Sequence, residues 1–145
     1  MAIRCLRLAG IYLLVGMTMG IAMGATERFA LAPAHAHLNL LGWVTLAIAA
    51  TVFALWPQAS TTRLARTFFW LYNLALPPTM IGLSFVLLGN AQWMPVVVVG
   101  QVALYAAAII FVANLFIHVR NAPALPAQEP VAQPRGPSVA VAEAR

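Results

Sequence analysis

Two of the three histidines in this chain lie two residues apart at the start of an apolar segment. His35 and His37 follow Pro33, and apart from Asn39 the residues just after them are apolar. Imidazole is a common ligand of heme iron, copper and zinc. If the segment enters a membrane, an ionisable side chain at its edge is costly unless it has a partner. The histidine pair is therefore the strongest indication of chemistry in the sequence.

The spacing of the two histidines predicts that their rings point in different directions. Pro33 suits the first turn of a helix, which places both histidines in its first two turns. Each residue advances ~100° around a helix, so the two rings diverge by ~200° and cannot both bind one metal ion. The His35 side continues with Asn39 and Gly42, where a flat macrocycle or another helix could approach closely. The His37 side is bulky and apolar, so the pattern slightly favours His35 as the inward ligand.

The composition is typical of an integral membrane protein. The chain has 145 residues, of which 63% are hydrophobic and 8% are charged, and its mean hydropathy is +0.89. A soluble domain of this length could not cover so much apolar surface. A helix needs roughly 20 residues to cross a bilayer. We expect an all-α membrane domain over residues 1–120, a bundle of four transmembrane helices at about 8–24, 34–56, 64–88 and 95–118.

The arginines predict the orientation of this bundle in the membrane. The chain has no lysine, and seven of its eight arginines precede the first span, lie between the second and third, or follow the fourth. With four spans these positions share one side of the membrane, which the positive-inside rule assigns to the cytoplasm. We therefore expect a multi-pass protein of a bacterial inner (plasma) membrane with both termini in the cytoplasm. Because the arginines are explained by the membrane orientation, the formal charge of +5 does not indicate a nucleic acid partner. The expected surrounding is the lipid bilayer.

The last segment, residues 121–145, has a different composition. It contains five prolines and seven alanines and has no long apolar run. Such a segment cannot bury enough apolar surface to offset the entropy of ordering. We expect a disordered cytoplasmic tail that can be removed without loss of membrane insertion or of a bound cofactor.

The first apolar stretch could be a cleaved signal peptide or a retained span. Arg4 and Arg7 precede it, and small residues occur near its end. Its apolar run is longer than is usual for a signal peptide, and its glycines have another explanation, so a span is favoured. Gly16, Gly20 and Gly24 recur every four residues, a pattern that lets helix backbones approach closely in lipid. Packing within the chain is favoured over a dimer contact.

Polar residues and prolines within the later spans predict further structural features. Asn73 and Asn114 lie in the inner half, where an interhelical hydrogen bond is expected. Pro77–Pro78 predicts a kink in the third span, with a partner or a cavity for the carbonyl groups that lose their donors. Gln101 and Tyr105 are four residues apart on one face of the fourth span, which suggests polar groups inside the bundle.

Other side chains could complete a site at the histidine end. Thioether and imidazole together suit Cu(I), and a His/Met pair also binds heme, although methionine commonly fills gaps in helix bundles. Arg28 could bind a carboxylate such as a heme propionate, although pairing with Glu27 or with lipid headgroups is favoured. His118 lies across a bilayer core of ~30 Å from the pair and cannot join its site. All methionines other than Met1 fall in the middle-to-outer part of the predicted bundle, the half that holds the histidine pair: Met17, Met19, Met23, Met80 and Met94.

The segment from His35 to Trp43 resembles helix II of the heme–copper oxidase subunit I superfamily, which includes cytochrome c oxidase and nitric oxide reductase subunit I-like proteins. In that family a histidine at the outer end of helix II is an axial ligand of the low-spin heme, a role that the resemblance implies for His35 or His37. Full members of the family have many more helices, and these carry their other heme and copper ligands. The resemblance therefore implies a small truncated relative that lacks the histidines of a complete heme–copper centre, and it leaves open whether the chain is an enzyme.

Three functions remain open from the sequence. The first is a membrane b-type heme protein in electron transfer or heme sensing, completed by a homodimer, a His/Met pair or a partner subunit. The second is a copper-binding or copper-assembly protein that uses its histidines and a methionine such as Met23. The third is a non-catalytic accessory subunit of a respiratory complex, in which the histidines only form hydrogen bonds. The sequence contains no P-loop, dinucleotide fingerprint, Ser/His/acid set or carboxylate pair, so no residue is assigned a catalytic role.

Overall fold

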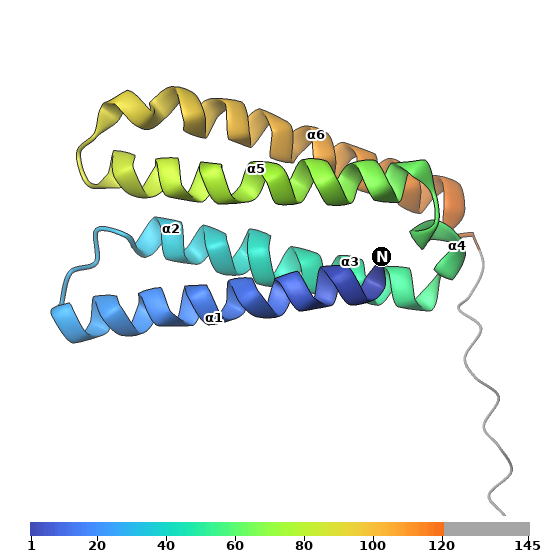
Figure 1. The fold of residues 1–145 in the computed structure, drawn as a ribbon, viewed down its shortest axis with the longest axis horizontal. Coiled ribbons are helices and arrows are strands. Elements are labelled where there is room, and N and C mark those ends of the chain that lie inside the picture. The colour runs from blue at the N-terminus through green and yellow to red at the C-terminus, as the bar shows by residue number, and fades with distance from the viewer. Residues whose placement is uncertain (121–145) are drawn as a thin grey trace, which may run out of the picture.

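Four long helices form two antiparallel hairpins in the computed structural model, which describes residues 1–120 (Figure 1). The tail expected at residues 121–145 lies outside the described residues. The first hairpin pairs one long helix with a composite helix of three segments, and a short helix connects it to the second hairpin. The elements in chain order are α1 (Ala2–Thr26), α2 (Ala32–His37), η1 (Leu38–Val44), α3 (Thr45–Leu55), α4 (Pro57–Ser60), α5 (Arg63–Leu87), η2 (Ala91–Trp93) and α6 (Met94–His118).

Four helical stretches of the described chain are long and apolar enough to cross a membrane. The predicted all-α class and the predicted number of spans are therefore confirmed, and the chain is a multi-pass membrane protein. The helices begin earlier than the apolar stretches that predicted them, because a helix can continue beyond the hydrocarbon core and carry its arginines into the headgroup region. The observed stretches are Ala2–Thr26, Ala32–Leu55, Arg63–Leu87 and Ala91–His118.

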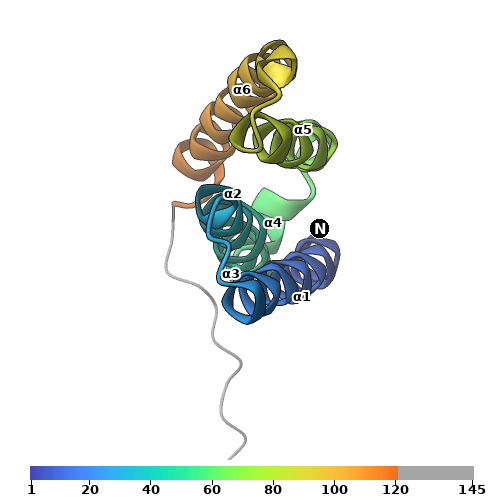
Figure 2. The same ribbon diagram turned by 90° about the vertical axis from the view of Figure 1, so that its left-hand side faces the viewer.

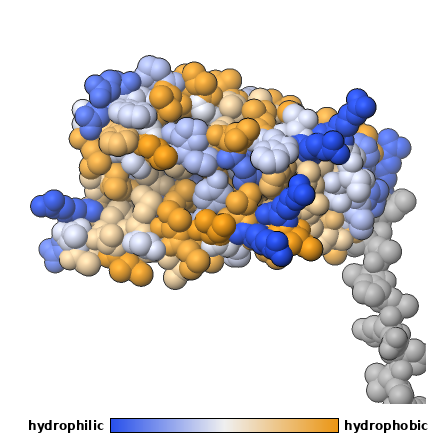
Figure 3. Space-filling view, in the orientation of Figure 1, coloured by the Kyte–Doolittle hydropathy of each residue, from blue (hydrophilic) through white to orange (hydrophobic). Residues whose placement is uncertain are grey.

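Arginines gather at the end of the bundle where α1 and α5 begin and α6 ends (Figure 1). Arg28 alone lies in the connection at the other end. In the space-filling view the most hydrophilic residues lie toward the two ends, with a largely hydrophobic zone between them (Figure 3). This distribution agrees with the arrangement from which the sidedness was predicted, and the sidedness itself stays a prediction.

Small residues allow the helices of each hairpin to approach closely. A Cβ atom added at Gly42 of η1 would lie 2.6 Å from the Cβ atom of Tyr12 on α1, a separation that real atoms do not adopt. In the second hairpin, a Cβ atom added at Gly100 of α6 would collide with the side chain of Thr79 on α5. Both contacts require glycine, because any larger side chain would force the helices apart.

Aromatic side chains join the two hairpins toward the arginine end. Phe53 of α3 lies with its ring centroid 5.9 Å from that of Phe111 on α6, and Phe111 lies 4.8 Å from Phe68 on α5. Nearer the middle of the bundle, the Tyr72 hydroxyl of α5 donates a hydrogen bond of 3.0 Å to the carbonyl oxygen of Leu41 in η1. Together these contacts fix the second hairpin against the composite helix, since edge-to-face rings and a satisfied buried hydroxyl are both favourable.

One prediction about polar groups is wrong, and another holds at one of its two residues. Gln101 and Tyr105 do not face the interior, because both are exposed on α6. The expected interhelical hydrogen bond forms at Asn114, which bonds to Ala59 and Thr62, but not at Asn73. The amide of Asn73 donates to the Phe69 carbonyl of its own helix, and its Oδ1 atom has no partner among the described residues. Sequence position placed both asparagines at a similar depth, but depth alone does not determine which face of a helix they occupy.

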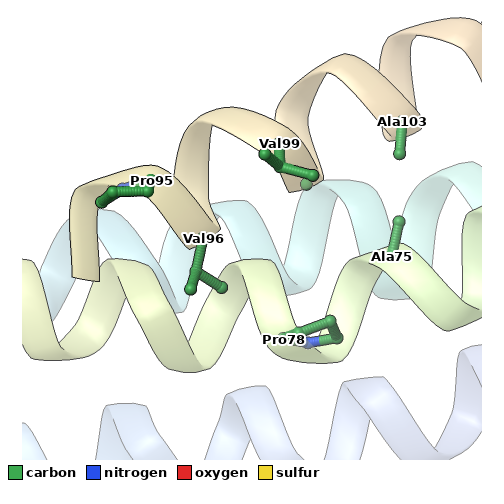
Figure 4. A pocket seen from close by; sticks show the side chains of 7 residues that line it. Ala75, Pro78, Pro95, Val96, Val99 and Ala103 are labelled. Carbon is green, nitrogen blue, oxygen red and sulfur yellow. The ribbon is translucent and has the colours of Figure 1, made fainter.

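The two prolines lie within one continuous helix, because α5 runs from Arg63 to Leu87 through both of them. A cavity of about 400 Å³ opens beside Pro78 between α5 and α6 (Figure 4). Its lining contains no side chain that could bind a metal ion or donate a proton: Ala75, Pro78, Pro95, Val96, Val99, Gly100 and Ala103. This cavity is therefore not a candidate for the chemistry suggested by the histidines.

Candidate functional site

The histidine pair lies on α2, the first segment of the composite helix. Pro33 occupies the first turn, as predicted, where its missing N–H costs no hydrogen bond. The helix changes character immediately after His37, because residues Leu38–Val44 form a π-helix. π-Helical turns are rare and are frequent at functional sites, so this segment singles out the same region as the histidines do.

His35 points into the interface between α2 and α1. Its Nδ1 atom lies 2.8 Å from the Gly16 carbonyl oxygen, and a Cβ atom added at Gly20 would lie 3.0 Å from its Cε1 atom. A carbonyl oxygen only accepts hydrogen bonds, so Nδ1 carries a proton, and in the neutral ring Nε2 is then the nitrogen with the lone pair. The imidazole thus lies over two glycines and links the two helices of the first hairpin.

Asn39 and Gly42 complete the packing of this side against α1. The Asn39 amide donates to the His35 carbonyl oxygen at 2.9 Å, and a Cβ atom added at Gly16 would lie 2.5 Å from its Nδ2 atom. Gly42 lies against Tyr12. The side that was expected to admit either a macrocycle or another helix therefore holds a helix, and no room for a macrocycle remains there. The preference for His35 as a heme ligand on this face is accordingly not supported.

His37 faces away from the other helices. It is exposed, and its Nδ1 atom lies 2.7 Å from the Pro33 carbonyl oxygen one turn earlier. By the same argument as for His35, Nδ1 is the donor and the Nε2 lone pair is directed away from this bond. Metal-ligating histidines commonly have such an arrangement, in which one ring nitrogen is held by a carbonyl oxygen and the other binds the metal.

The surface below His37 is apolar and unpartnered. Leu40, Val44 and Ile48 follow it at helical spacing and have exposed fractions of 59%, 38% and 54%. A hollow of about 320 Å³ lies further along this side of the composite helix. Its lining is Trp43, Val44, Ala47, Ile48, Thr51 and Val52. His37 is therefore an imidazole at the edge of an open apolar surface.

The other proposed ligands do not converge on the histidines. Met23 is buried on α1, one turn beyond the Gly20 that lies against His35, whereas Met17 and Met94 are exposed. Arg28 is exposed and forms no ion pair with Glu27. Within residues 1–120 no group of three or more His, Cys, Asp or Glu side chains is placed to hold a metal ion.

His118 lies at the opposite end of the bundle, as expected. Its Nδ1 atom lies 3.3 Å from the Asn114 carbonyl oxygen of its own helix. His118 therefore cannot bind the same metal ion or cofactor as the histidine pair, because the two lie at opposite ends of helices that span the whole bundle.

A polar network at the arginine end was not foreseen in detail. Asn114 is fully buried, and its amide donates to the Ala59 carbonyl oxygen at 2.9 Å while its Oδ1 atom accepts from the Thr62 hydroxyl at 2.9 Å. The same hydroxyl caps α5 by accepting from the Ala65 N–H. An asparagine inside an apolar span signals a buried hydrogen bond, but only the position of α4 supplies its partners.

Comparisons with known proteins add no assignment. No family model matches the chain, no curated protein matches it, and no solved structure matches it. The likeness of residues 35–43 to helix II of the oxidase superfamily thus depends on that segment alone.

Proposed function

We propose that this protein binds heme b at the histidine end of the bundle, with His37 as the axial ligand, and carries electrons within a bacterial inner membrane. The observation that carries the proposal is the position of His37. Its ring is oriented by the Pro33 carbonyl, its Nε2 atom is open, and an apolar surface extends below it. An axial histidine nitrogen beside an apolar surface for the macrocycle is one of the common ways in which proteins hold heme.

The proposal includes a second copy of the chain. One protomer offers one outward-facing histidine, and an exposed axial ligand leaves the other face of a heme open. In a twofold dimer the same surface is contributed by both copies, so His37 of each would bind opposite faces of one heme. The bound group would supply one-electron redox chemistry, and this chain would supply the ligands and the apolar slot.

Arg28 is assigned to the propionates of the heme. It lies in the α1–α2 connection at the same end as His37, and its guanidinium has no carboxylate partner in residues 1–120. A guanidinium binds a carboxylate through two parallel hydrogen bonds. The resemblance of residues 35–43 to a heme-binding helix supports the role of His37 independently of its geometry, and does not extend to Arg28.

The test is the optical spectrum of the purified full-length protein expressed with ample heme. We expect a Soret band and a reduced-minus-oxidised difference in the wild type. We expect loss of both in His37→Ala and retention of both in His118→Ala, which removes a histidine at the other end. The Arg28→Gln variant should retain heme less tightly than the wild type.

Different outcomes distinguish the remaining functions. A wild type without heme that copurifies with copper, and loses it in His37→Ala, favours the copper-binding function. A wild type with neither heme nor copper leaves the histidines a hydrogen-bonding role, as in an accessory subunit of a respiratory complex. Either result overturns the heme proposal.

A further inference from the structure

A polar cavity of about 470 Å³ lies at the arginine end of the bundle, far from the histidine pair. Arg4 of α1 and Arg66 of α5 line it, together with residues of the connection between α4 and α5. The full lining is Met1, Arg4, Ser60, Thr61, Thr62 and Arg66. It joins the two hairpins at the level where the spans would leave the membrane.

Nothing in the described chain neutralises this cavity. Glu27 is the one acidic side chain among residues 1–120, and it lies at the opposite end. No ion pair forms anywhere in this part of the chain, and Arg7 and Arg63 add positive charge at the same end. A cavity with two guanidinium groups and no carboxylate favours an anion.

The hydroxyl groups of the cavity shape it and do not donate to a ligand. The Ser60 hydroxyl donates to the Pro57 carbonyl oxygen at 2.7 Å, and the Thr62 hydroxyl donates to Asn114. The side-chain donors left for a ligand are the two guanidinium groups, and the N-terminal end of the α5 dipole also favours negative charge. Arginine is the side chain best suited to bind phosphate oxygens through paired hydrogen bonds.

A separate apolar groove lies further along α1 and α5, beginning about 10 Å beyond Arg4 along α1, and shares no lining residue with the cavity. Its volume is about 230 Å³, and Ile11 and Val15 on α1 face Pro77 and Ile81 on α5 across it. On α1 these residues lie seven and eleven positions after Arg4, so they share its helical face. The rest of the lining is Tyr12, Met19, Ala34, Leu38, Met80 and Ser84.

The helices that flank this groove are not packed against each other. α1 contacts the composite helix along its length and makes little contact with α5. In the end-on view, α1 and α5 lie on the same side of the bundle (Figure 2). The seam between them therefore offers a basic cavity at one end and an open apolar groove beyond it.

We propose that this seam binds one anionic diacyl phospholipid, with its phosphate between Arg4 and Arg66 and an acyl chain in the groove of Ile11, Val15, Pro77 and Ile81. Charge complementarity selects an anionic head, and a groove on the same two helices, about 10 Å further along α1, selects a ligand whose apolar tail is long enough to reach it. Basic pockets between transmembrane helices commonly hold such headgroups. The lipid bridges the two hairpins where protein contacts are few.

The first experiment measures selectivity in the wild type. Full-length protein is exchanged into detergent with equimolar phosphatidylglycerol and phosphatidylcholine, and retained lipid is counted by native mass spectrometry. We expect about one phosphatidylglycerol per chain and several-fold less phosphatidylcholine. Equal retention of the two lipids overturns the proposal without any variant.

The second experiment uses matched variants. Arg4→Gln/Arg66→Gln removes the two cavity arginines, and Arg7→Gln/Arg63→Gln removes two others from the same helices and the same end. Since each basic residue near an anionic surface contributes on the order of 1 kcal/mol, phosphatidylglycerol should bind at least about tenfold more weakly to the first variant. The second should bind it nearly as well as the wild type. Equal loss in both indicates general attraction and contradicts a defined site.

A third comparison separates a lipid from free phosphate. Long-chain phosphatidylglycerol should raise the melting temperature of the wild type, while short-chain phosphatidylglycerol should raise it less and inorganic phosphate should leave it unchanged. If inorganic phosphate protects as well as the long-chain lipid, the groove plays no part and the lipid assignment is wrong. All three readouts are independent of heme content.

Discussion

The Nδ1 atom of His35 lies 2.8 Å from the carbonyl oxygen of Gly16 on the neighbouring helix. His37, two residues later, bonds instead to Pro33 of its own helix. The sequence pattern slightly favoured His35 as the ligand, and the two histidines have different surroundings in the structure. The first holds two helices together, and the second presents its free nitrogen to the surface.

The glycines of α1 provide the first prediction. Gly16→Ala should destabilise the protein by about 1–3 kcal/mol, because the added Cβ would overlap the Asn39 side chain and force the helices apart. Gly24→Ala is the matched control, since nothing lies within 4 Å of a Cβ atom added there. It should be neutral or stabilising by up to about 1 kcal/mol, because alanine favours the helix. Thermal unfolding in detergent measures both, and equal effects would refute the packing of α1 described above.

The two histidines should differ in their effect on stability. His35→Ala removes an interhelical hydrogen bond and should lower the free energy of unfolding by about 1 kcal/mol. His37→Ala removes an exposed side chain and should change it by less than about 0.5 kcal/mol in protein without cofactor. A larger loss in His37→Ala than in His35→Ala, measured by unfolding in the absence of heme, would reverse the roles assigned to them.

Asn114 should be essential to the arginine end of the bundle. Asn114→Ala leaves the Ala59 carbonyl oxygen and the Thr62 hydroxyl without their buried partner. We expect a loss of about 1–3 kcal/mol in the free energy of unfolding, because unpaired polar groups inside the protein are costly. The control is Gln92→Ala, an exposed amide near the other end, which should have little effect. An Asn114→Ala variant as stable as the control would mean that water replaces the network.

The orientation of the bundle can be tested with reporter fusions. Fusions after Arg66 and Arg120 should report a cytoplasmic location, and fusions near Phe29 and Gln92 a periplasmic one, because arginine-rich ends remain inside. A periplasmic location of the fusion after Arg120 would contradict both the four-span topology and the proposed sidedness.

The number and approximate position of the spans could be predicted because hydropathy depends on composition over roughly 20 residues. The direction in which side chains face could be predicted only where a strong pattern exists. The glycine spacing correctly indicated close packing at Gly16 and Gly20 but not at Gly24, which nothing approaches. Gln101 and Tyr105 were placed inside the bundle and are exposed. An apolar span has similar residues on all faces, so its periodicity carries little information about its inner face.

The π-helix explains why the candidate site could be predicted only in part. The divergence of His35 and His37 follows from a regular turn, which α2 provides. No sequence signal predicts the change to a π-helix after His37, nor the close contact of Gly42 with Tyr12. That contact also decides that α1, and not a macrocycle, occupies the Asn39 and Gly42 side. Such pairings arise only when distant segments come together.

The most direct test of the account is the visible spectrum of the wild type and of His37→Ala, each purified with ample heme. The account predicts a Soret band in the wild type, its loss in His37→Ala, and its retention in His118→Ala. A wild type without a Soret band, or a His37→Ala variant with a full heme complement, would contradict the proposed heme site.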